Sequence, residues 1–208
     1  MRAHSGWALA LVVGGTLDEP LVLGRRRLTL AAVDDEVNTQ PYHAAASLGV
    51  ARGRAIVERC AARAEELALE GLRRLADEFA PHRLVSCAIL TSKPKVTLDL
   101  ETTLRSHALI HGAEGLLFRE AVARAAVACG LELHPVQESE ALALAAAAWH
   151  CKPASVEKRL TDLRRSAGAP WTRDEKLATI AGLLALREPG VSRKHRRVRV
   201  HSNKSLLA

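Results

Sequence analysis

A long amphipathic segment between residues 44 and 79 is the feature that most constrains the fold. Its apolar residues recur every three or four positions, as in a helix with one buried face; they are Val57, Cys60, Ala61, Ala64, Leu67, Ala68, Leu72, Leu75 and Phe79. Charged residues fill the other side, and Pro81 ends the pattern. The spacing predicts one long helix over 44–79, with Gly53 as the point at which it can break. Because aromatic residues make up only 3% of the chain, this helix must pack through small aliphatic side chains.

Short apolar runs alternate with further helical segments along the rest of the chain. Strands are predicted at 7–13, 21–31, 84–90 and 131–136, and helices at 100–129, 139–149, 155–168 and 172–187. Gly14 and Gly15 separate the first two strands, which predicts an antiparallel hairpin. Residues 32–43 are predicted to form a loop. This order predicts an α/β fold whose mixed sheet starts with the hairpin, continues with parallel strands and is flanked by helices.

Three serine and threonine residues are predicted to begin the last three helices. Ser139 and Ser155 are candidate N-caps. Thr172 is followed three residues later by Glu175, which is the spacing of a capping box.

The positive charge of the chain is concentrated at its C-terminal end. The formal net charge is +7, and residues 189–208 contain six basic residues and no acidic ones. The sequence therefore predicts one nearly neutral domain over 1–188 and a basic tail over 189–208. Such a tail would bind nucleic acid in a salt-dependent way; the candidate contacts are Arg193, Lys194, Arg196, Arg197 and Arg199. A solvated tail without a partner is an equal alternative.

The cysteines and the hydropathy pattern limit the cellular setting. Four cysteines are spread along the chain without a C-x-x-C pair, which favours a reducing compartment and argues against a cysteine zinc site. The apolar run 7–13 is short for a secretory signal, and no run reaches the length of a membrane span. We therefore expect a cytoplasmic location and no membrane partner.

Four segments resemble the ribonuclease-H-like superfamily, and most of all the Holliday-junction resolvases of the RuvC type. They are Gly-Trp-Ala-Leu at 6–9, the helix-to-strand passage at 79–85, His-Gly-Ala-Glu-Gly at 111–115, and the helix at 173–186. The resemblance covers most of residues 6–187. It implies the ribonuclease-H-like form of the α/β fold and a role in binding nucleic acid.

The same resemblance argues against the chemistry of that family, which needs clustered carboxylates that hold two divalent ions. None of the residues 1–5 is acidic, and Cys87 stands where the family has a strand glutamate. Arg173 and Lys176 occupy the helix positions of the aspartates, unless a register shift brings in Asp174 or Glu175. The resemblance therefore implies a catalytically degenerate protein that binds nucleic acid or another protein. RuvC-type nuclease activity is not expected.

His107, His111 and Glu114 form the sharpest local pattern. Their spacing places them on one face of a helix, and two imidazoles with a carboxylate suit a metal site or a general acid/base centre. The alternative is a helix surface whose histidines pack against a neighbour. An enzyme that uses these residues is thus a second hypothesis, with a divalent metal as the only candidate cofactor. A structural oligomeric subunit is a third hypothesis, and a homodimer is one state that the sequence leaves open.

Two further segments are candidate anion contacts. Arg25, Arg26 and Arg27 interrupt a strand pattern and would either contact phosphate or protect an edge strand. Lys93 and Lys95 follow the strand at 84–90, where α/β folds bind ligands, although such a segment is more often a solvated loop.

Overall fold

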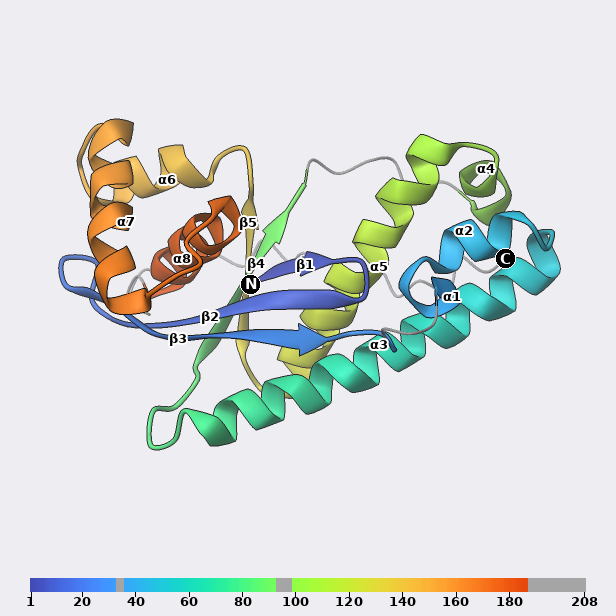
Figure 1. Cartoon of the computed structure of the whole chain (residues 1–208), viewed down its shortest axis with the longest axis horizontal. Coiled ribbons are helices and arrows are strands. Elements are labelled where there is room, and N and C mark those ends of the chain that lie inside the picture. Colours follow the sequence, from blue (N-terminus) through green and yellow to red (C-terminus); the bar gives the residue numbers. More distant parts are fainter. Residues whose placement is uncertain (33–35, 93–98, 187–208) are drawn as a thin grey trace, which may run out of the picture.

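The computed structural model describes residues 1–32, 36–92 and 99–186, and it contains two small sheets (Figure 1). In the first sheet, the antiparallel strands β1 (Arg2–His4), β2 (Trp7–Gly15) and β3 (Pro20–Thr29) lie in the order β1-β2-β3. The second sheet pairs β4 (Ser86–Thr91) with β5 (Glu132–Gln137) in parallel. The α/β class and the N-terminal hairpin are confirmed. The single mixed sheet that the sequence predicted is wrong, since the antiparallel and the parallel strands form separate sheets and parallel pairing is confined to β4 and β5 among the described strands.

Met1 connects the two sheets. Its ammonium group donates a hydrogen bond to the carbonyl oxygen of Ala88, and its own carbonyl oxygen accepts one from the amide of Leu90 at 3.0 Å. Successive side chains of a strand point to opposite faces. In β4, Cys87 and Ile89 accordingly enter one hydrophobic core, whereas Ala88 and Leu90 enter the other.

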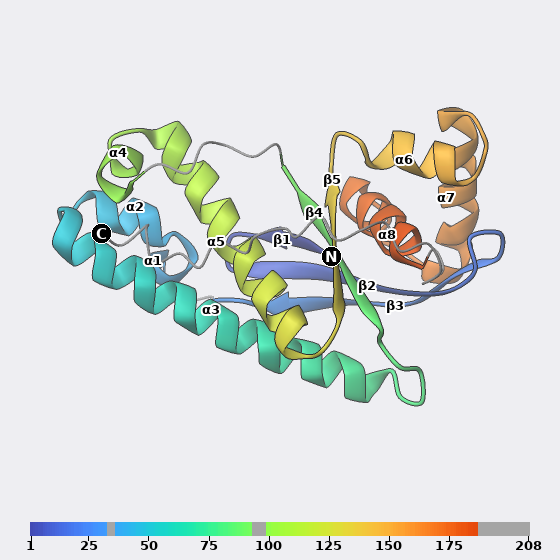
Figure 2. The ribbon, with the colours of Figure 1, turned by 180° about the vertical axis from the view of Figure 1, so that it is seen from behind.

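Helices cover both faces of the strands (Figures 1 and 2). Their bounds are α1 (Glu36–Thr39), α2 (Pro41–Ala46), α3 (Val50–Glu78), α4 (Leu100–Leu104), α5 (His107–Ala128), α6 (Ala141–Ala148), α7 (Pro153–Ala167) and α8 (Arg173–Ala185). The helices α1, α2 and α4, with the adjoining parts of α3 and α5, extend beyond the strands at one end of the molecule (Figure 1). The first core is formed with α3 and α5, and the second with α6, α7 and α8. None of the helices in the described part of the chain is long and apolar enough to cross a membrane.

Two predicted helices are interrupted at places other than those expected. The helix predicted over 44–79 is divided between α2 and α3 at Gly49, whose positive φ of 77° leaves the helical region, and Gly53 lies inside α3. A Cβ at Gly53 would lie 2.9 Å from the Cβ of Ala45, so glycine there permits close packing of α2 on α3. The helix predicted over 100–129 divides into α4 and α5 before Ser106, whose backbone is extended.

The predicted loop at 32–43 is wrong where it overlaps α1 and α2. Pro41 lies in the first turn of α2, where its missing amide proton costs nothing. Neither short helix has enough turns to show a hydrophobic period, so the segment was indistinguishable from a loop in the sequence. This error matters because α2 carries part of the candidate site.

The predicted helix starts have different outcomes. The capping box of α8 is confirmed: the Thr172 hydroxyl accepts a hydrogen bond from the amide of Asp174, and the Glu175 carboxylate accepts one from the amide of Thr172 at 2.8 Å. The two serine caps are wrong. Glu140 precedes α6, and Ser155 lies within α7, which begins at Pro153.

Candidate metal site

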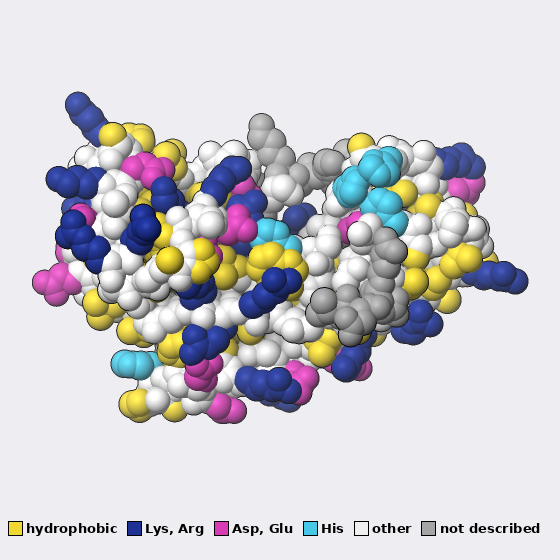
Figure 3. Space-filling model, viewed as in Figure 1, with side chains coloured by type: hydrophobic (Ala, Val, Ile, Leu, Met, Phe, Trp, Pro, Cys, Tyr) yellow, Lys and Arg dark blue, Asp and Glu magenta, His cyan; other side chains and the backbone are white. Residues whose placement is uncertain are grey.

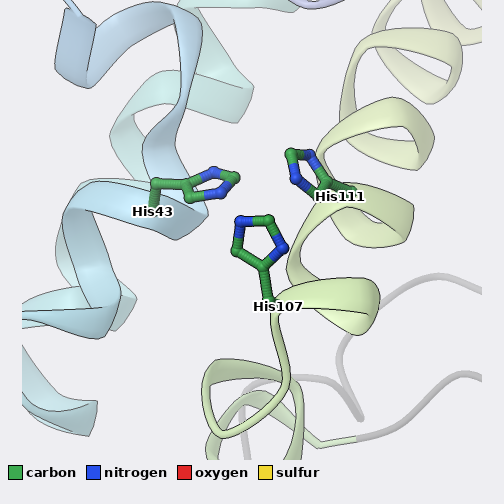
Figure 4. A group of neighbouring side chains, drawn as sticks. All are labelled: His43, His107 and His111. Atoms are coloured by element: carbon green, nitrogen blue, oxygen red, sulfur yellow. The ribbon is translucent and has the colours of Figure 1, made fainter.

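Three histidines converge between α2 and α5, and each offers one ring nitrogen to a common space (Figure 4). His43 comes from α2, and His107 and His111 come from the first turns of α5. The three nitrogens lie within 4.8 Å of one another. Zinc–nitrogen bonds of about 2.0–2.1 Å in a tetrahedral site place the ligand atoms about 3.3 Å apart. Binding of one zinc ion would therefore require the nitrogens to approach one another by up to about 1.5 Å.

The local structure explains why the two α5 histidines face the same way. Ser106 precedes the helix as its N-cap residue, so His107 is the first helical residue. His111 follows four residues later and lies on the same face, because residues four apart are neighbours on a helix surface. The ring centroids of these two histidines are 4.3 Å apart.

Glu114 supports His43 from behind. Its side chain is only 2% exposed, and its Oε1 accepts hydrogen bonds from His43 Nδ1 at 2.9 Å and from the His43 amide at 3.3 Å. When Nδ1 of His43 carries the proton, Nε2 presents its lone pair to a metal. A carboxylate bound to the other nitrogen of a ligating histidine is a common second layer of metal sites, where it fixes the tautomer and the ring orientation.

His107, His111 and Glu114, which the sequence analysis grouped together, therefore have different roles in the structure. His107 and His111 meet a third histidine, while Glu114 reaches that histidine instead of the common space. His43 was missed because it lies in the segment predicted as a loop, 64 positions before His107. No local pattern connects it to α5, since only the packing of α2 on α5 brings the two together.

The site is open to solvent. His107 and His111 are exposed and His43 is half-buried, and histidine side chains gather on the surface at the end of the molecule built by α2, α4 and α5 (Figure 3). A metal held by three protein nitrogens keeps a coordination position for water or a substrate.

Replacement of Glu114 by glutamine is expected to weaken metal binding about 10- to 100-fold, the usual range for a lost carboxylate partner of a ligating histidine. Glutamine keeps the size of the side chain but removes the charge that favours the Nδ1-protonated tautomer of His43. A competition titration with a chromophoric chelator measures the change. Unchanged affinity in a folded E114Q variant would contradict the supporting role of Glu114.

The only tyrosine of the chain reports on the charge beside the site. Burial, followed by the nearby carboxylates of Glu120 and Glu114, raises the pKa of Tyr42 to about 12. The folded protein thus holds the phenol proton more strongly than the unfolded chain, whose tyrosine titrates near 10. This contribution to stability is present below about pH 10 and is lost as the pH rises from about 10 to about 12. Absorbance at 295 nm follows the phenol, and a midpoint near 10 in the folded state would contradict the expectation.

The other predicted anion contacts are engaged in the fold where the structure describes them. Arg25 donates to the carbonyl oxygens of Ala169 and Pro170, and Arg26 donates to the Glu78 carboxylate. The guanidinium of Arg27 lies over the Trp7 ring, 4.0 Å from its centroid.

Lys93 and Lys95 lie outside the described residues. The same holds for the predicted tail contacts Arg193, Lys194, Arg196, Arg197 and Arg199.

The positions that the resolvase resemblance singled out carry mixed charge. Asp174 Oδ2 lies 2.8 Å from His4 Nε2, and Asp174 Oδ1 lies 3.3 Å from Arg2 Nε. Arg173 pairs with Glu138 at 2.8 Å. Cys87 is buried beside Met1. Asp174 and Glu138 thus each have a cationic partner within the protein.

No family model matches the chain, and no curated protein is significantly similar to it. The chemistry of the site must therefore be argued from its own residues.

Proposed function

We propose that this protein binds a divalent transition-metal ion, with zinc as the best match, through His43, His107 and His111. The observation that carries the proposal is the convergence of three ring nitrogens within 4.8 Å, one of them on a histidine held by a buried glutamate. Two unrelated helices contribute these nitrogens, so the spacing of residues within one helix does not explain the convergence.

The ligand set limits the metal. Imidazole suits zinc, copper, iron and nickel, whereas magnesium and calcium prefer oxygen ligands. Three histidines with an open position form the ligand set of hydrolytic zinc sites, in which the metal lowers the pKa of its bound water to about 7. The reaction class that fits is metal-assisted attack of water on a polarised substrate. Glu114 would orient His43 in that reaction and, since it is buried behind His43, would not itself take the proton of the attacking water.

Metal analysis of the protein purified without a histidine tag tests the proposal. We expect about one equivalent of zinc per chain after exposure to zinc and extensive dialysis. The H82A variant is the control for replacement of a site histidine and is expected to retain the metal. His82 is exposed near the C-terminal end of α3, at the opposite end of that helix from α2. A wild-type chain that retains no metal would overturn the proposal.

Nucleic-acid binding by a ribonuclease-H-like domain without nuclease activity is a second candidate. Its support is the positive charge of the segment 152–165, which contains five basic residues and two acidic ones. The pairing of Asp174 with Arg2 and His4 supports the lack of metal-dependent nuclease chemistry in this candidate. The Arg2 guanidinium already compensates the charge of that carboxylate.

Fluorescence anisotropy with linear and four-way-junction DNA across a salt series tests this second candidate. The full chain is compared with a chain ending at Glu188. Binding by both chains with preference for the junction would support recognition by the folded domain. Binding by the full chain alone, with a steep salt dependence, would assign the affinity to the tail, and no binding by either would reject the candidate.

A further inference from the structure

Arg119 carries a half-buried guanidinium group without an ion-pair partner among the described residues. The two acidic groups that influence it most, Glu120 and Glu138, pair with other arginines. Glu120 lies 3.4 Å from Arg124, and Glu138 lies 2.8 Å from Arg173. Burial lowers the pKa of the Arg119 guanidinium from its ordinary value, as expected for a cation whose desolvation is not fully compensated.

This guanidinium belongs to the helix that carries two of the candidate ligands, eight residues beyond His111. Its Nη1 is 3.3 Å from the position that a Cβ would take on Gly115, and Gly115 is one helical turn beyond His111. The four residues from His111 to Gly115 rise about 6 Å along the helix, and helical side chains lean toward the N-terminus, so the Arg119 guanidinium extends along α5 in the direction of His111. Glycine at 115 places no side chain of its own between the two groups.

The charges of the two groups favour the same class of ligand. Three neutral imidazoles leave the +2 charge of a bound metal uncompensated in its first layer, and the buried Glu114 reduces it from behind His43. Arg119 adds a second positive charge about one turn away. Guanidinium groups bind phosphate and carboxylate oxygens through paired hydrogen bonds. A ligand with an oxyanion would therefore interact with both groups at once.

We infer that Arg119 binds an oxyanion, phosphoryl or carboxylate, of a ligand that also occupies the open position of the metal at His43, His107 and His111. The inference rests on the proposed metal site and adds the substrate class to it. Arg119 is the residue that selects anionic substrates, and Gly115 keeps the path between Arg119 and the metal clear.

Anion titrations of the cobalt-loaded protein test the inference, because cobalt accepts the same ligands and its visible absorption changes when an anion enters the coordination sphere. Inorganic phosphate and acetate are titrated separately, so that the two sources of the oxyanion are distinguished. We expect the R119Q variant to hold the same amount of cobalt but to bind the preferred anion about 10- to 100-fold more weakly, the effect of losing a charged hydrogen-bond donor. The R119K variant is expected to lie between the two.

The R73Q variant is the control, since it removes one exposed guanidinium from α3 and changes the net charge equally. Equal anion affinity in wild type and R119Q, or no binding of either anion, would overturn the inference and leave the metal site intact. If the wild type takes up no cobalt or zinc, the metal proposal fails, and this inference fails with it.

Discussion

Alanine in place of His43, His107 or His111 is expected to lower zinc affinity by more than about 100-fold, because each change removes a direct ligand and the loss exceeds that of an outer partner. The three variants differ in their effect on the fold. His107 and His111 are exposed, so their replacement is expected to leave the free energy of unfolding of the metal-free protein within about 0.5 kcal/mol of wild type.

The H43A variant is expected to lose stability as well. It leaves the Glu114 carboxylate, which is 2% exposed, without the imidazole that donates to it. The His43 amide at 3.3 Å remains as a donor, and the loss of the imidazole from a buried acceptor is expected to cost about 1–3 kcal/mol. Chelator competition measures affinity and urea unfolding of the metal-free proteins measures stability, with H82A as the control for both. Wild-type affinity in all three variants would exclude this site, and wild-type stability of H43A would contradict the role of the His43–Glu114 pair.

The F118A variant is expected to lower the free energy of unfolding by about 3–5 kcal/mol, the usual cost of removing a fully buried phenylalanine. Phe118 has no solvent exposure and lies in the first core, where α5 packs on α3 and on the strands. Because α5 also carries His107 and His111, the loss would show how far the metal site depends on the core beneath it.

Urea unfolding with and without zinc measures the effect, and L116A on the same helix is the control. Leu116 is 36% exposed, so its truncation is expected to cost less than about 1 kcal/mol. Similar losses for the two variants would contradict the assigned packing of α5. Zinc is expected to recover part of the stability of F118A, since a ligand that binds only the folded state raises the unfolding free energy.

The sequence predicted the elements whose residues repeat a pattern many times. The long stripe from Val57 to Leu75 identified most of α3, and the continuous apolar run of β4 identified a strand buried on both faces. Such patterns reflect burial, and the hydrophobicity of each residue indicates its own burial without reference to distant segments. The bounds were less accurate, because a glycine such as Gly49 or an extended residue such as Ser106 ends a helix without disturbing the apolar period.

Only part of the candidate site could be predicted from the sequence. The spacing of His107 and His111 on one helix face was readable, since it depends on helix geometry alone. The third histidine could not be predicted, because His43 belongs to a helix too short to show a hydrophobic period. The same spacing gave Glu114 a place beside the two histidines, whereas packing directs its side chain to His43. The contact between the sheets at Met1 was equally hidden, since strand pairing between distant segments leaves no local pattern.

Pro135 in β5 has a consequence for how this protein behaves at high concentration. The amides of Glu132 and Glu138 donate to the carbonyl oxygens of Val85 and Thr91, so the even-numbered residues of β5 direct their amides toward β4. The odd-numbered residues, Pro135 among them, direct theirs outward, to the side where no described strand pairs. A proline there removes a donor that an added strand would need. The edge is thereby protected against strand-by-strand aggregation, and a P135V change would give it back a full set of outward donors.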